Sequence, residues 1–336
     1  MLRVFIQAVV SLHTVILCAV VGMRLLAPVM TEERPHLLLA AYTGSMNYTV
    51  IHDTQYHQTV RLTPGWFISA STDGNYITQS VMSEYKLILD MQTQNQVRLD
   101  RRPNYNSTWS NDGTRFLLEE NGDIYWFDTR NMESVPIANY SWTEKYAAWS
   151  PDDEWLSFVI SHPDDWENLF IRSTTDLDSE LVQLTFFTEG DILATSWSPD
   201  GIEIAYIYST ENSFSIQKVN TLTGHKTVLA ENAAGIHQIH WLPDSQHIIY
   251  NLQTGRRFVS IQLHQLNTQT LESRPIDDRY VWITDFKPSP DHEWVTVVRR
   301  VGTSNVTELM YLPTGEIHSV APEFPGTSLP HWITLP

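Results

Sequence analysis

The sequence predicts an all-β protein: a single β-propeller, in which short antiparallel sheets stand as blades around a central channel. A tight-turn motif recurs along the chain, each copy leads into a strand-like segment, and both chain ends hold parts of one further blade. The full motif is W-S-P-D-G at 197–201, whose residue types suit the successive positions of a tight turn. Residues 202–208 then alternate with the two-residue period of a strand.

The copies of the motif are spaced as propeller blades are. Their aspartates stand at 73, 112, 152, 200, 244 and 291, so the steps are 39, 40, 48, 44 and 47 residues. A period of this size with four short strands per unit indicates a propeller. Asp153 and Ser245 stand in place of the turn glycine in their copies, and the copy at Asp291 carries an extra residue. The residues expected to form the repeat turns and the packing between sheets are Trp109, Asp112, Trp149, Asp152, Trp197, Asp200, Trp241, Asp244, Asp291 and Trp332.

The two chain ends are predicted to share a blade. Trp332 lies 46 residues after Phe286, the aromatic residue of the preceding copy, and resembles the end of an innermost strand. Residues 36–42, 47–53 and 58–62 read as three outer strands without an inner one. Pairing of the two ends closes the ring and removes its free sheet edge. The count is seven blades with this shared blade, or six if the N-terminal strands lie outside the ring.

The N-terminus is predicted to be a membrane anchor. Residues 4–23 contain no charge and are bracketed by Arg3 and Arg24, and twenty helical residues span roughly 30 Å. The alternative is a cleaved signal peptide, which would give a secreted or periplasmic protein. The expected organisation is an anchor at 1–30, a short stalk at 31–35 and the propeller at 36–336. We expect a single-pass protein of the cell membrane with an extracytoplasmic propeller.

Charge and cysteine content narrow the classes of partner. The chain has 21 basic and 39 acidic residues, a net charge of −18, which disfavours binding to nucleic acid. The one cysteine, Cys18, lies in the anchor segment, so the propeller is expected to contain no disulfide.

The motif, followed by an alternating strand and a third strand ending in Asp-Thr or Asn-Thr, resembles the WD40-like PD40 repeat of TolB-like propellers. Such repeats also occur in the propeller domains of prolyl-oligopeptidase-type enzymes. The likeness covers roughly residues 36–334, and 197–201 matches in full. It implies a periplasmic or extracytoplasmic propeller that binds protein or peptide partners. The α/β domain of TolB itself is not expected here, so the resemblance is applied to the fold and not to TolB's role.

The sequence gives little indication of catalysis. No G-x-S-x-G nucleophile motif is present, and neither catalytic residues nor a cofactor are assigned. His237 and His240, with His247 nearby, invite a metal interpretation. In a regular strand, however, residues three apart point to opposite faces, so no metal site is predicted.

Two arginine pairs are the first candidate binding residues. Arg256, Arg257, Arg299 and Arg300 fall in or beside loops between the second and third strands of neighbouring blades, on the face that also carries the connections between blades. Together they would bind a carboxylate or an acidic peptide. The alternative is that they pair with nearby acids. The acids considered are Glu272, Asp277 and Asp278.

The second candidate is the loop at residues 162–167, on the same face. Trp166 is flanked by acids and is interpreted either as a contact residue or as a side chain that folds back onto its own blade. Asp164 and Asp165 could bind a cation, but two adjacent acids alone do not form a calcium loop. The predicted function is therefore a membrane-anchored, extracytoplasmic propeller that acts as a protein- or peptide-binding or scaffold module. The alternative is a channel-centred enzyme, a lyase or hydrolase acting on carbohydrate or peptide.

Overall fold

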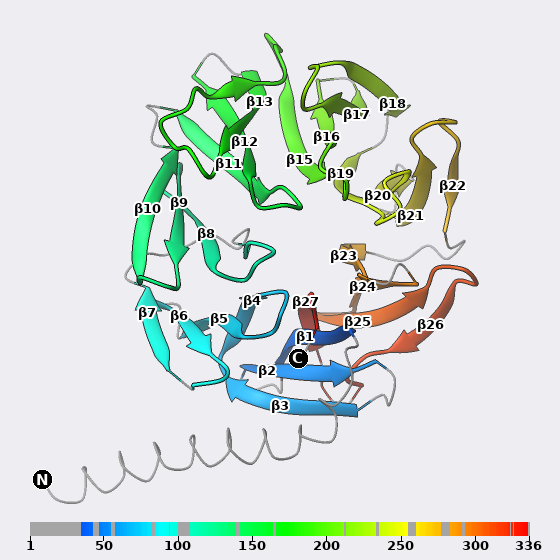
Figure 1. Cartoon of the computed structure of the whole chain (residues 1–336). Helices are drawn as coiled ribbons and strands as arrows, with labels where there is room; N and C mark the ends of the chain where they lie inside the picture. The colour runs from blue at the N-terminus through cyan, green and yellow to red at the C-terminus, as the bar shows by residue number, and fades with distance from the viewer. Residues whose placement is uncertain are drawn as a thin grey trace, which may run out of the picture.

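The computed structural model of the chain is a ring of antiparallel sheets around a central channel (Figure 1). The structure describes residues 35–42, 47–54, 58–81, 85–93, 95–99, 108–138, 142–163, 166–211, 213–232, 235–254, 260–276, 283–290, 293–322, 324 and 326–334. Among the described strands, six sheets each use strands that are consecutive in the chain, and a further sheet has the order β27-β1-β2-β3. The chain is therefore an all-β propeller, as predicted.

The strands of each sheet are given below from the innermost to the outermost. The exception is the three-stranded sheet, which has no named innermost strand. The shared sheet contains β27 (Gly326–Thr334), β1 (Pro35–Tyr42), β2 (Asn47–Asp53) and β3 (Gln58–Pro64). The next contains β4 (Trp66–Ala70), β5 (Tyr76–Val81), β6 (Tyr85–Asp90) and β7 (Gln96–Leu99). A three-stranded sheet follows, with β8 (Arg115–Glu120), β9 (Asp123–Asp128) and β10 (Glu133–Ala138), and here a bridge from Trp109 to Phe116 occupies the inner position.

The remaining four sheets have four strands each. They contain β11 (Thr143–Trp149), β12 (Trp155–His162), β13 (Trp166–Ser173) and β14 (Val182–Gln183); then β15 (Asp191–Trp197), β16 (Glu203–Ser209), β17 (Phe214–Asn220) and β18 (Lys226–Asn232). Next come β19 (Ile236–Trp241), β20 (His247–Thr254), β21 (Ser260–Asn267) and β22 (Ser273–Pro275); and finally β23 (Ile283–Pro288), β24 (Trp294–Val301), β25 (Ser304–Tyr311) and β26 (Glu316–Ser319).

The two ends of the chain close the ring. β27 and β1 are antiparallel, with Trp332 opposite Leu37 and Thr334 opposite Pro35. Trp332 therefore lies in the sheet formed by the N-terminal strands, and the predicted pairing of the ends is confirmed. The predicted anchor at 1–30 and stalk residues 31–34 lie outside the described residues. No helix in the described part of the chain is long and apolar enough to span a bilayer.

The repeat turn is held by the side chains of its own serine and aspartate. Ser198 Oγ donates to Asp200 Oδ1 at 2.6 Å, and Ser198 Oγ accepts the backbone N–H of Glu203 at 2.9 Å. The last turn residue, Gly201, has φ +72°, a left-handed conformation that suits glycine. The Ser–Asp bond recurs at Ser71–Asp73, Ser110–Asp112 and Ser150–Asp152. These short hairpin turns join the first and second strands of the blades.

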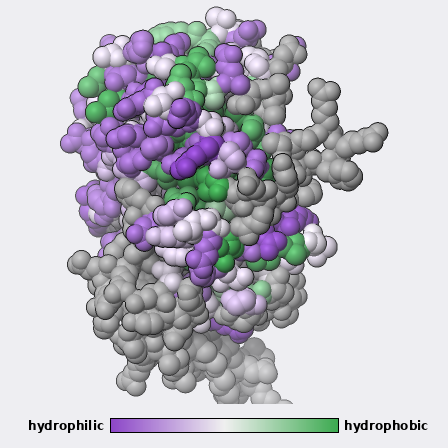
Figure 2. Space-filling model, turned by 90° about the vertical axis from the view of Figure 1, so that its right-hand side faces the viewer, coloured by the Kyte–Doolittle hydropathy of each residue, from purple (hydrophilic) through white to green (hydrophobic). Residues whose placement is uncertain are grey.

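The aromatic residue before each turn packs between neighbouring sheets. Trp197 on β15 donates its indole N–H to the carbonyl of Ala148 on β11, at 3.4 Å. Trp149 stacks on Trp126 of the preceding sheet, with ring centroids 5.7 Å apart. Hydrophobic clusters of this kind, each made of residues from two adjacent sheets, form the core. The side of the ring seen in Figure 2 is largely hydrophilic where it is described, with hydrophobic residues between the polar ones.

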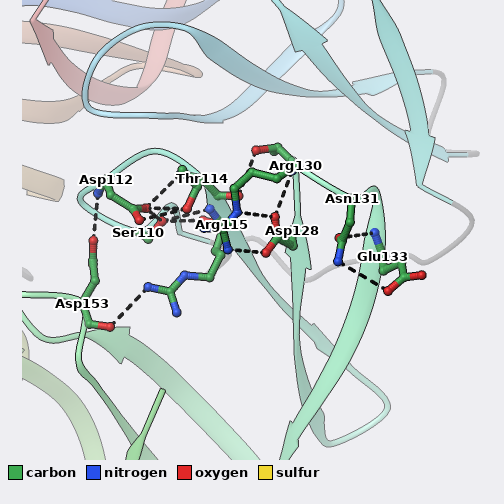
Figure 3. A network of polar contacts seen from close by, with 10 residues as sticks. Ser110, Asp112, Thr114, Arg115, Asp128, Arg130, Asn131, Glu133 and Asp153 are labelled. Carbon is green, nitrogen blue, oxygen red and sulfur yellow. Dashed lines mark hydrogen bonds and ion pairs between the residues drawn. The ribbon is translucent and has the colours of Figure 1, made fainter. Parts of the chain in front are cut away.

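Asp153 shows why one repeat departs from glycine. It has φ +59°, but its carboxylate accepts the backbone N–H of Asn111 and of Asp112 in the neighbouring turn and the side-chain amide N–H of Asn111, all at 2.8 Å. Figure 3 shows the contact with Asp112. The Arg115 guanidinium donates to the Asp153 carbonyl at 3.3 Å and lies over the Trp149 ring. The acid therefore links two blades, which a glycine could not do.

Asp153 and Ser245, which both stand in place of the turn glycine, should respond oppositely to replacement by glycine. Asp153→Gly relieves a left-handed strain of about 1–2 kcal/mol but loses the three charge-assisted hydrogen bonds of its carboxylate, of about 1.5 kcal/mol or more each, so we expect a net loss of about 3 kcal/mol. Ser245 has φ +52°, and its side chain has no hydrogen bond among the described residues, so Ser245→Gly should stabilise the protein by about 0.5–1 kcal/mol. Urea unfolding of both variants measures the difference, and a shift of the same sign in both would contradict this account.

Candidate functional site

The innermost strands share an irregularity that shapes the channel. In β4, β11, β15, β19 and β23 the pairing with the second strand shifts register once. A register shift of this kind turns an extra residue out of the ladder. The residues within these shifts that line the central cavity are Ile68, Tyr146, Ala147, Leu193, His237, Gln238 and Thr284.

Buried side chains from other strands fix these bulges. Glu119, which is 4% exposed, accepts the backbone N–H of Ala147 at 2.9 Å. Glu167 accepts that of Ile192 at 2.8 Å. Asn251 Oδ1 accepts both N–H groups released by the β19 bulge, at 3.0 and 2.8 Å. Because unpaired buried amides are costly, these bonds stabilise the irregular strands in one conformation.

The central cavity has a volume of about 680 Å³ and is lined by residues from the innermost strands around the ring. Its size falls in the range of small-molecule sites, roughly 300–1,000 Å³. A polar group concentrates on three adjacent strands, β19, β23 and β27. The residue before the repeat aromatic is His240, Asp285 and His331 on these strands, while it is smaller on others, such as Ser69, Thr108 and Ala148.

These polar residues have distinct contacts. His240 packs edge-on against Phe286, with ring centroids 5.2 Å apart, and His331 packs edge-on against Phe67 at 6.2 Å. Asp285 Oδ1 accepts the side-chain amide N–H of Gln238 at 3.0 Å. Lys287, two residues after Asp285, also lines the cavity. We call Gln238, His240, Asp285, Lys287 and His331 the channel cluster.

The electrostatics of the cluster keep its histidines neutral. Burial, followed by the charge of Lys287, lowers the pKa of His240 to about 4, against an opposing effect of Asp285. Burial and then Lys287 also lower the pKa of His331 to about 3, although a backbone hydrogen bond with Ala70 opposes the shift. At neutral pH each imidazole can therefore donate one N–H and accept at the other nitrogen.

The sequence analysis assumed a regular strand, in which His237 and His240 point to opposite faces, and this premise was wrong. The register shift between Ile236 and Ile239 interrupts the two-residue period, and both histidines line the cavity. They contact different rings, since His237 meets Phe214. In the described part of the chain, no group of three or more His, Cys, Asp or Glu is arranged to hold a metal ion.

The two arginines of the predicted site that the structure describes have different contacts. Arg299 makes two bonds of 2.7 Å to Glu308, which is 8% exposed, so its guanidinium already binds a carboxylate of its own sheet. Arg300 is exposed and donates to the carbonyl of Gly302 at 3.4 Å. Arg256 and Arg257 lie outside the described residues. Glu308, the partner of Arg299, was not among the acids considered from the sequence, which were Glu272, Asp277 and Asp278.

Trp166 folds back onto its own blade and remains half-buried. Its ring stacks on His162 with centroids 4.2 Å apart and planes 6° apart, and His162 meets Trp142 edge-on at 4.7 Å. Trp142 is 38% exposed. We call Trp142, His162 and Trp166 the aromatic stack. The sequence analysis did not identify Trp142, because only the pairing of β11 with β12 brings it near this loop. Asp164 and Asp165 lie outside the described residues.

Comparison with solved structures identifies the architecture. A putative TolB from Agrobacterium tumefaciens is 17% identical, with a TM-score of 0.56 over 70% of this chain and 87% of that one. An oligogalacturonate lyase in complex with manganese is 14% identical, with a TM-score of 0.65 over 87% of this chain and 86% of that one. The propeller domain of the Trilobed protease from Pyrococcus furiosus is 15% identical, with a TM-score of 0.63 over 87% and 93%.

These comparisons show the fold alone, and the fold is a TolB-like β-propeller. The Pyrococcus domain is described as having an open velcro topology, whereas in this chain β27 and β1 are paired. No protein-family model and no curated protein matches the chain.

The lowered histidine pKa values predict an acid-sensitive stability. An unfolded histidine titrates near pH 6.5, so below that pH the unfolded chain binds protons that folded His240 and His331 do not. Their contribution to stability is complete above pH 6.5 and is lost as the pH falls towards about 4 for His240 and about 3 for His331. His240→Gln should therefore lose less stability than the wild type between about pH 7.5 and about pH 5 in urea unfolding. His225→Gln, at an exposed turn position, is the control, and an unchanged slope in His240→Gln would refute the assignment.

Proposed function

We propose that the protein is a membrane-anchored, extracytoplasmic β-propeller that binds a protein or peptide partner on one face of the ring. That face carries the loops between the second and third strands of the blades, and we call it the BC face. The observation that supports this is the aromatic stack, which lies where β12 turns into β13 and leaves Trp142 exposed. Ordered aromatic side chains of this kind are preferred anchors in protein interfaces.

The surroundings of the stack favour a basic partner segment. Trp166 forms a backbone bridge with Gly190, and Gly190 lines an adjacent cavity of about 530 Å³. Three exposed acids, Glu189, Asp191 and Glu211, also line this cavity. Lysine or arginine side chains are attracted both to carboxylates and to the faces of tryptophan rings. The partner is therefore expected to present cationic residues rather than the acidic ones that the arginine pairs would select.

The proposed location rests on the sequence. Residues 4–23 carry no charge and are long enough to span a bilayer, which would hold the propeller close to the membrane on the extracytoplasmic side. The net charge of −18 disfavours nucleic acid as a partner. Fractionation tests the anchor: the full chain should remain with membranes after alkaline carbonate washing and be released by detergent.

Binding of matched peptides tests the BC face. A lysine-rich peptide should bind the full chain, a glutamate-rich peptide of the same length should not, and Trp166→Ala should weaken binding by about tenfold or more because it removes the centre of the stack. Leu222→Ala is the control, since Leu222 is 87% exposed in the turn between β17 and β18, away from the BC face. Tryptophan fluorescence or calorimetry gives the affinities. Preferential binding of the acidic peptide, or an unaffected Trp166→Ala variant, would reject the proposal.

The channel cluster supports a second candidate function, a channel-centred enzyme acting on carbohydrate or peptide. Histidine, aspartate and lysine converge in one cavity, as general acid–base chemistry requires. One of the structures with this fold is an oligogalacturonate lyase. The two candidates separate by site: a binding module loses function on substitution of the aromatic stack, and an enzyme on substitution of the channel cluster.

A further inference from the structure

The ammonium group of Lys287 stands out from the other charged groups of the propeller. In the part of the chain that the structure describes, Lys287 Nζ has neither a hydrogen bond nor an ion pair. Other cations are engaged: Lys145 pairs with Glu167, Lys218 with Glu203 and Arg299 with Glu308. Lys287 therefore presents an unpaired positive charge inside a strongly acidic protein, where an anionic ligand can pair with it.

The position of Lys287 is fixed by its backbone and not by its side chain. Its N–H donates to Thr296 Oγ1 at 3.2 Å, and its carbonyl accepts the Thr296 hydroxyl at 3.1 Å and the Trp332 indole N–H at 3.3 Å. The strand is thus held on both sides, while the four-carbon side chain and its ammonium remain available to the cavity. This arrangement pre-organises a cation without neutralising it.

Two neutral histidines flank this cation on the adjacent innermost strands. β23, which carries Lys287, lies between β19 with His240 and β27 with His331, and all three side chains line the same cavity. A neutral imidazole has one N–H donor; the backbone hydrogen bond with Ala70 engages that of His331 and leaves its other ring nitrogen as an acceptor. Ser69, Thr108, Thr195 and Thr284 add hydroxyl groups around the cavity.

We propose that Lys287, His240 and His331 form a binding site in the central channel for a small carboxylate that also carries hydroxyl groups. The Lys287 ammonium and the His240 N–H donate to the carboxylate, and the acceptor nitrogen of His331 takes a hydrogen bond from a ligand hydroxyl. The threonine and serine hydroxyls, with Asp285, bind the ligand hydroxyls. Asp285 opposes a bare anion, but its Oδ1 accepts from Gln238 at 3.0 Å and is thereby held by a neutral donor of β19. This site is separate from the BC face and does not depend on the function proposed for that face.

A matched pair of sugars tests the proposal, because glucuronate and glucose differ in a carboxylate. Calorimetry on the full chain in detergent should show saturable binding of glucuronate and binding of glucose weaker by about tenfold or more. Lys287→Met should weaken glucuronate binding by about tenfold or more, and Lys287→Arg should retain most of it. Lys226→Met is the control for net charge, since Lys226 is exposed on the strand β18.

A second measurement does not rely on a variant that folds. In the wild type, glucuronate should shift the NMR signals of the His240 and His331 rings, and glucose should not shift them. Neutralisation of Lys287 by the carboxylate should also raise the pKa of both rings, so glucuronate binding should take up protons in weakly acidic buffer. Equal binding of the two sugars, absence of binding by both, unaffected histidine signals, or wild-type affinity in Lys287→Met would each overturn the proposal.

Discussion

The pairing of β27 with β1 is the constraint on which the rest of the structure depends. It places Trp332 against Val50 and Leu309, residues near opposite ends of the chain, in one buried cluster. It also brings the Trp332 indole to the carbonyl of Lys287, so the last strand supports the neighbouring blade as well as its own. His331 reaches the channel only because this strand occupies the innermost position. The pairing that closes the ring therefore also places His331 in the channel cluster.

The features that could be predicted from the sequence are those with local chemistry. The Ser–Asp turn carries its own hydrogen bonds, and an aromatic residue precedes it in most blades, so the turns, the strands and the shared terminal sheet could all be predicted. The bulges were not, because their stabilising groups are distant in sequence. Glu119 caps an amide 28 residues away, and Asn251 caps one 14 residues away. Once the bulge in β19 is present, alternation no longer tells where His237 and His240 point.

Sheet register also explains why the arginine pairs were a poor guide to a site. In the β24–β25 ladder Glu308 lies opposite Val297, which makes it a diagonal neighbour of Arg299 on the same face. Adjacent arginines in the sequence point to opposite faces, so Arg299 is paired while Arg300 is exposed. The channel histidines, by contrast, had a usable signal: His240 and His331 both directly precede the repeat aromatic. Lys287 has no such signal in the sequence. It is notable because its ammonium group has no hydrogen bond or ion pair in the described part of the fold, and only the structure shows this.

The two proposed sites would accept opposite signs of charge, and the fold explains how one acidic domain could carry both. Of the exposed acids beside the aromatic stack, Glu189 and Glu211 lie in loops and Asp191 begins β15, where solvent screens them and a basic segment can approach. Lys287 lies inside the ring, where strand backbone and neutral histidines separate it from those loops. Because the pKa values of His240 and His331 are far below neutrality, these two histidines stay neutral over the physiological pH range. On these proposals, a ligand in the channel and a partner on the BC face would be bound at the same time, each selected by a different group.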